Sequence, residues 1–132
     1  MLISDLHHVS IVVADTARAL AFYRDLLGLE VVARPDLGYP GAWLAVGARQ
    51  IHLLEVPNPD PAEGRPRHVG RDRHLALLVD DLGACAARLE RSGRAFTRSR
   101  SGRAALFCRD PDGNGVEIIE HALRGGEDVA DT

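Results

Sequence analysis

The chain has 132 residues, of which 45% are hydrophobic and 27% are charged, and its formal net charge is -3. This length and composition predict one ordinary soluble domain, or two very small ones that share a core. The mixed charges exclude the basic face that nucleic-acid binding requires, and the strand-length apolar stretches are too short to span a bilayer.

The cysteines and the N-terminus both favour a cytoplasmic protein. Cys85 and Cys108 fit no closely spaced zinc or redox motif, which is typical of a reducing compartment. The opening residues MLISDLHHVS lack the basic start and long apolar run of a signal peptide.

The first half of the chain predicts the order β-α-β-β-β. Residues 8–14 (HVSIVVA) form a β-branched run, after which Asp15 is expected to cap a helix over 15–28 that Gly28 ends. The apolar stripe of that helix is predicted to contain Ala19, Leu20, Tyr23, Leu26 and Leu27. Three further strand-length segments, 29–35, 42–48 and 49–57, are separated by Gly and Pro.

The second half predicts the same order after a linker. Residues 57–73 are dense in Pro, Gly and charge, and their arginines, like those of 94–103, are expected in solvated loops and at strand edges. A turn is predicted in DPDGNG (110–115), and the tail 125–132 is expected to fray. The predicted elements are a strand at 74–80, a helix at 81–93 and strands at 94–100, 105–110 and 115–121.

The two halves superpose in one register with a single-residue slip. His8 and His74 are 66 positions apart, and His52 and Glu117 are 65 apart. Two copies of one module related by an approximate two-fold axis would bring these four side chains together at the axis. Three imidazoles and one carboxylate suit one divalent metal ion such as Zn, Ni, Co, Mn or Fe.

Strand alternation separates these four residues from their neighbours. Glu55 and Glu120 lie on the opposite faces of their strands from His52 and Glu117, so we expect solvated or edge-paired carboxylates there. The other histidines, His7, His68 and His121, are predicted to be structural or surface residues.

The sequence resembles the vicinal oxygen chelate superfamily, which includes glyoxalase I, bleomycin- and fosfomycin-resistance proteins, methylmalonyl-CoA epimerase and extradiol dioxygenases. The resemblance covers about residues 5 to 122 and is carried by HHVSIVVADTARALAFYRDLLGLEVV, RHLALLVDD and RDPDGNGVEIIE. It implies metal-binding positions at His8, His52, His74 and Glu117. At position 52, however, glyoxalase-type members commonly carry Glu and the epimerase carries Gln.

The resemblance implies an α+β fold of two βαβββ modules with pseudo-two-fold symmetry, the glyoxalase/bleomycin resistance/dihydroxybiphenyl dioxygenase-like fold. The expected single domain, 1–132, contains module one at about 5–58, a linker at about 59–72, module two at about 73–122 and a flexible tail at 123–132. The resemblance also implies a small-molecule substrate and a homodimer. Neither nucleic acid nor a membrane is an expected partner.

Four protein ligands on an octahedral ion leave two adjacent positions for a substrate that chelates through neighbouring oxygens. The ion would act as a Lewis acid in a lyase, isomerase or epimerase reaction, with Glu117 as the candidate catalytic base because it is the only carboxylate ligand. Two alternatives remain open. An Fe(II) extradiol dioxygenase would use His8, His74 and Glu117, and a protein resembling bleomycin-resistance proteins would bind a drug or metabolite without catalysis.

Overall fold

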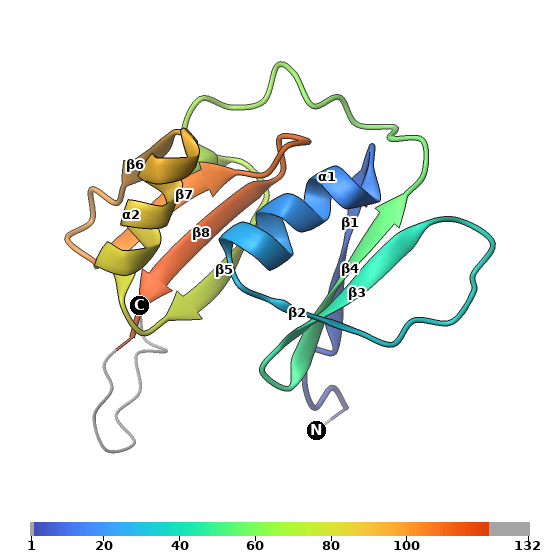
Figure 1. The fold of residues 1–132 in the computed structure, drawn as a ribbon. Helices are drawn as coiled ribbons and strands as arrows, with labels where there is room; N and C mark the ends of the chain where they lie inside the picture. Colours follow the sequence, from blue (N-terminus) through green and yellow to red (C-terminus); the bar gives the residue numbers. More distant parts are fainter. Residues whose placement is uncertain (1, 122–132) are drawn as a thin grey trace. The chain divides into compact units, whose positions relative to one another are not determined.

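The chain divides into two compact units, with the boundary in the sequence between Pro61 and Ala62. The computed structural model describes residues 2–121, so the tail expected to fray lies outside the described residues. Each unit contains one four-stranded sheet and one principal helix, which confirms the α+β class and the two βαβββ modules (Figure 1). No helix within residues 2–121 is long and apolar enough to cross a membrane.

Module one, which ends at Pro61, has the strand order β1-β4-β3-β2. The first and last strands are parallel, because the helix between β1 and β2 carries the chain back across the sheet, and the other pairs are antiparallel. Its elements are β1 (His8–Val13), α1 (Thr16–Leu20), η1 (Ala21–Leu26), β2 (Glu30–Val32), β3 (Gly41–Val46) and β4 (Arg49–Glu55). Its largest fully buried side chains are Phe22, Tyr23, Leu44, Ile51 and Leu53.

Module two, which begins at Ala62, repeats this topology with the order β5-β8-β7-β6. Here β5 and β8 are the parallel pair (Figure 1). Its elements are η2 (Val69–Arg71), β5 (His74–Val79), α2 (Leu82–Ser92), β6 (Phe96–Arg98), β7 (Ala105–Arg109) and β8 (Gly115–Glu120). Its core contains Leu89, Leu106, Val116 and Ile118.

The first helix departs from the regular periodicity predicted for residues 15–28. It begins with Asp15 as its N-cap, as expected, but changes at Ala21 to the wider π geometry, in which the Leu27 N–H donates to the Phe22 carbonyl at 2.9 Å. The wider turn displaces the 3.6-residue stripe. Phe22, which the prediction omitted, is therefore fully buried, whereas Leu20, Leu26 and Leu27 are only half-buried.

Part of the segment predicted as a linker is packed against the second sheet. Val69 is buried, and the Asp72 carboxylate accepts hydrogen bonds from Arg65 at 2.6 Å and Arg109 at 2.8 Å. The Asp72 side chain is only 5% exposed, so these arginines hold the pKa of its carboxyl well below the usual range. The expectation that arginines 65–73 are simply solvated is thus wrong for Arg65, because Asp72 lies beside it.

The last strand of each module caps the helix of the same module. The Glu55 carboxylate accepts hydrogen bonds from the backbone N–H and hydroxyl of Thr16 at 2.8 and 2.9 Å, and Glu120 accepts one from the Leu82 N–H at 2.9 Å. These contacts replace the expected solvated or edge-paired carboxylates. A negative charge at a helix N-terminus satisfies free N–H groups and complements the helix dipole.

We expect Glu55→Ala and Glu120→Ala each to lower the free energy of unfolding by about 1 kcal/mol, because each leaves helix N–H groups unsatisfied. Urea denaturation measures the change. Glu63→Ala, at an exposed position in the loop, is the control and should change stability by less than about 0.5 kcal/mol. Equal effects for all three variants would contradict the capping role.

Candidate functional site

His8 and His52 lie on one face of the module one sheet. Ser10 of β1 and Trp43 of β3 flank His52 in register, so the side chains at 8, 10, 43 and 52 share that face. The His52 ring is stacked between two others, that of His8 with centroids 3.9 Å apart and that of Trp43 with centroids 4.1 Å apart. The two predicted ligands of module one are therefore brought together, but as a stack of rings.

His52 is also held by a hydrogen bond. Its Nε2 lies 2.7 Å from Oε1 of Gln50, and because an amide oxygen only accepts, Nε2 donates and has no lone pair for a metal in this arrangement. Burial lowers the pKa of His52 below the ordinary value of 6.5, and the nearby charges of His8, His7 and Arg34 lower it further. The side chain is thus kept neutral and fixed.

His74 and Glu117 form the corresponding pair in module two, where Nε2 of His74 lies 3.1 Å from Oε1 of Glu117. The other ring nitrogen, Nδ1, donates to the carbonyl oxygen of Asp72 at 2.8 Å. A neutral His74 therefore directs the Nε2 lone pair at a carboxylate oxygen. Two acceptors that face each other at this distance need a proton or a metal cation between them.

Glu117 is oriented by a residue that the sequence did not single out. Arg103, in the loop before β7, donates to Oε2 of Glu117 at 2.6 Å, while Oε1 faces His74. Glu117 is only 5% exposed, so this ion pair offsets the cost of burying its charge. No sequence spacing indicated Arg103, because the loop length before β7 decides where it lies.

Two aromatic residues also take equivalent places beside the candidate ligands. Trp43 stands in register with His52, and Phe107 stands in register with Glu117, its ring meeting the His74 ring edge-on at 5.9 Å. The cross-strand register would have identified both residues from the sequence.

Gly115 opposes His74 across the parallel pair, and a Cβ there would lie 2.9 Å from Cβ of His74, so only glycine leaves this histidine its space.

Each module thus presents a pair of predicted ligands. Among residues 2–121, no three His, Cys, Asp or Glu side chains are gathered as a metal site. The donor chemistry of His74 and Glu117 nevertheless fits a divalent ion, because an imidazole whose Nδ1 is fixed by a carbonyl and a hydrogen-bonded carboxylate are ordinary metal ligands. The set of four ligands stays a prediction.

We expect the pH dependence of stability to report on His52. Because its pKa is lower in the folded than in the unfolded chain, it contributes stability at neutral pH that is lost as the pH falls below 6.5. His52→Phe keeps a ring in the stack and removes this titration. Its free energy of unfolding should fall less than that of the unmodified protein between about pH 7.5 and about pH 5.

Urea denaturation at the two pH values measures this difference. The variant His121→Gln removes a histidine from module two, outside the stack, and controls for the loss of any titrating ring. If His52→Phe loses as much stability on acidification as the unmodified protein does, the assignment of His52 is wrong.

Comparison with known proteins identifies a family whose sequence profile matches most of the chain. A sequence profile described as the Glyoxalase/Bleomycin resistance protein/Dioxygenase superfamily matches residues 5–118. "Glyoxylase I 4" of Arabidopsis thaliana is 30% identical over 122 residues, covering 88% of this chain and 70% of the relative. "Lactoylglutathione lyase" of Haemophilus influenzae is 30% identical over 126 residues, covering 86% and 90%.

A solved structure agrees at the level of the fold. The crystal structure of a putative glyoxalase family protein from Bacillus anthracis superposes with a TM-score of 0.77 and 23% identity, covering 92% of this chain and 98% of the other.

Proposed function

Because the chain belongs to the glyoxalase/bleomycin resistance protein/dioxygenase superfamily, we propose that it is a metal-dependent enzyme of the glyoxalase type. Its substrate would be a small molecule with two neighbouring oxygens, and its reaction that of a lyase, isomerase or epimerase. This proposal rests on the 3.1 Å distance between Nε2 of His74 and Oε1 of Glu117, because two acceptors this close can share a bound cation. The expected homodimer stays a prediction.

In the proposed site, His8, His52, His74 and Glu117 hold one divalent ion. Bound there, the ion would supply Lewis acidity for a developing oxyanion. For this role Asp72 already fixes the Nδ1–H of His74, which leaves Nε2 for the ion. His52 would have to rearrange, because its Nε2 must leave Gln50 or its ring must turn out of the stack.

Arg103 gives the two oxygens of Glu117 different roles in this proposal. It holds Oε2, which leaves Oε1 as the atom nearest to His74 and the one suited to bind the ion. Glu117 is also the proposed base. An oxygen of Glu117 that accepts the substrate proton would have to be free of both Arg103 and the ion.

We expect protein purified without a metal-affinity tag to contain about one equivalent of a divalent metal per chain, because three imidazoles and one carboxylate are a donor set that suits such an ion. His74→Ala should lose most of the bound metal, since it removes the imidazole that faces Glu117. Elemental analysis and titration of the metal-free protein measure both. Unmodified protein that binds no divalent ion would overturn the proposal and favour a non-catalytic binding protein.

The same titration separates the role of Arg103. Arg103→Met should weaken metal affinity by about 10- to 100-fold, because it frees the carboxylate that Arg103 orients. Arg100→Met, at an exposed position of the same loop, is the matched control and should leave affinity unchanged. Equal affinities for the two variants would show that Arg103 does not position Glu117.

Glu117→Gln should abolish turnover even when the metal is bound, because the amide cannot accept the substrate proton. The assay uses lactoylglutathione, the compound in the name of one relative, or any substrate that the unmodified protein turns over. Metal content is measured on the same sample. Full turnover by the metal-loaded variant would exclude Glu117 as the base.

The fixed state of His52 favours one second candidate, an Fe(II) extradiol-type dioxygenase. If His52 stays bonded to Gln50, the ligands reduce to His8, His74 and Glu117, which is two histidines and one carboxylate. Such a set leaves three positions, enough for two substrate oxygens and dioxygen. Iron in the elemental analysis would favour this candidate, whereas zinc, nickel, cobalt or manganese would favour the first.

A further inference from the structure

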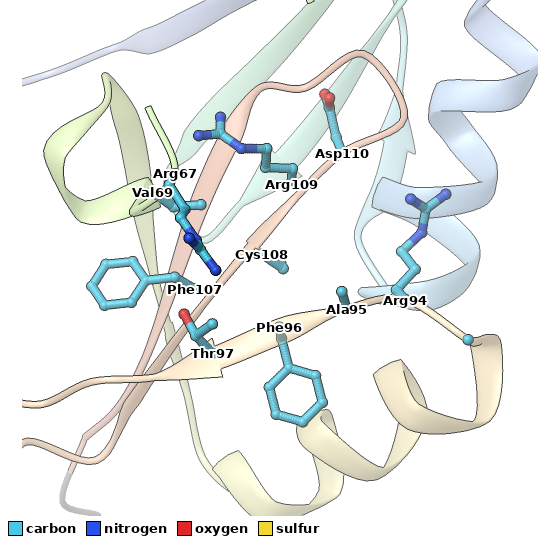
Figure 2. Close-up of a pocket in the computed structure, with 11 residues that line it drawn as sticks. Arg67, Val69, Arg94, Ala95, Phe96, Thr97, Phe107, Cys108, Arg109 and Asp110 are labelled. Atoms are coloured by element: carbon cyan, nitrogen blue, oxygen red, sulfur yellow. The ribbon is translucent and has the colours of Figure 1, made fainter. Parts of the chain in front are cut away.

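Module two contains a pocket of about 460 Å³ that the proposed metal chemistry does not use. It lies where β6 and β7 diverge, and the segment before η2 closes one side (Figure 2). The volume is in the range of small-molecule sites. The pocket is lined by Arg67, Val69, Phe96, Thr97, Phe107 and Cys108, together with residues 93–95, 109 and 110.

The charge around this pocket is positive. Arg67, Arg94 and Arg109 line it, against one carboxylate, Asp110. That carboxylate is engaged within its own turn, because Oδ1 accepts the N–H groups of residues 112 and 114 at 2.8 and 2.9 Å, and Oδ2 accepts from the Asn114 side chain at 2.9 Å. It therefore offers little to a cationic ligand.

The arginines differ in how far they are already occupied. Arg109 donates to the Asp72 carboxylate and to the carbonyl oxygens of Pro66 and Gly113. Arg67 is exposed and has no ion pair with any residue in the described part of the chain. Figure 2 shows its guanidinium among the lining side chains, pointing toward Thr97 and Phe107. Arg67 is thus the cation of the pocket whose donors a ligand can take.

The rest of the lining is neutral and largely apolar. Phe107 and Val69 supply hydrocarbon surface on the side toward which Arg67 points, where Phe107 shares a face of the β6–β7 ladder with Thr97, whereas the side chain of Phe96 lies on the opposite face with Cys108. Burial raises the pKa of the Cys108 thiol to about 12, so this residue stays uncharged and does not offset the arginines. Apolar walls with a few polar groups that fix orientation are typical of small-molecule sites.

We propose that this pocket binds a small molecule that joins an apolar, ring-sized body to an anionic group, a carboxylate or a phosphate, with Arg67 as the anchor of the anion. The planar guanidinium can donate two parallel hydrogen bonds to such an oxyanion. The body packs against Phe107 and Val69, on the face of the sheet that Thr97 shares.

Phe107 connects the pocket to the His74–Glu117 pair, since it stands in register with Glu117 and its ring meets that of His74. A ligand in the pocket therefore lies beside the proposed metal ligands, and the anion would be the end of the substrate remote from the ion. Only this last step rests on the proposed function. The binding itself needs no metal.

The test uses chelator-treated, full-length protein and calorimetric titration with phenyl phosphate, benzoate, inorganic phosphate and benzyl alcohol. Phenyl phosphate or benzoate should bind at least about tenfold more tightly than inorganic phosphate or benzyl alcohol, because only they join a ring to an anion. The better of the two identifies the anionic group. Amide chemical shifts should change at Thr97 and Phe107, which line the pocket.

Arg67→Gln should weaken that binding by about tenfold, the loss of one charge-assisted contact. Arg71→Gln, an exposed arginine a few residues away that does not line the pocket, should leave it unchanged. Undetectable binding of both aromatic anions, or equal loss in the two variants, would overturn the proposal. Because no metal is present, neither result depends on the proposed metal site.

Discussion

The parallel pairing of the first and last strands of each module is the constraint on which the rest of the structure depends. It requires a crossover helix between the first strand and the others, and it sets the start of the first strand beside the last. His8 and His74 therefore open strands whose neighbours carry His52 and Glu117. If the pairing of β1 with β4, or of β5 with β8, were shifted by one residue, the side chain of His52 or Glu117 would point to the helix-covered face. The His8–His52 and His74–Glu117 pairs would then be separated.

The strand pattern and the repeat were sufficient to predict the two-module fold and to select residues that lie together in pairs. Both depend on local periodicity and on backbone alternation, which a short sequence window records. His52 and Glu117 emerged because they occupy equivalent positions in the last strands of the two copies, 65 residues apart. The prediction for the first helix was less accurate, since the π turn that buries Phe22 breaks the period on which it relied.

Contacts made by long side chains across loops could not be predicted in this way. Arg103 reaches Glu117 from a loop, and Arg65 reaches Asp72 within a segment whose composition indicated only a linker. Such contacts depend on loop geometry rather than on periodicity. The bond between His52 and Gln50 was equally hidden, because it follows from side-chain rotamers.

The two capping carboxylates have a consequence for how the halves could diverge. Glu55 and Glu120 accept equivalent hydrogen bonds, so the helix N-terminus of each half is capped without help from residues on the candidate ligand face. That face is then free to change. One half surrounds its histidine with aromatic rings and an amide, and the other surrounds its carboxylate with an arginine and a histidine. The same topology thus carries different surroundings at equivalent strand positions, an ion pair with Arg103 in module two and a stack of rings in module one.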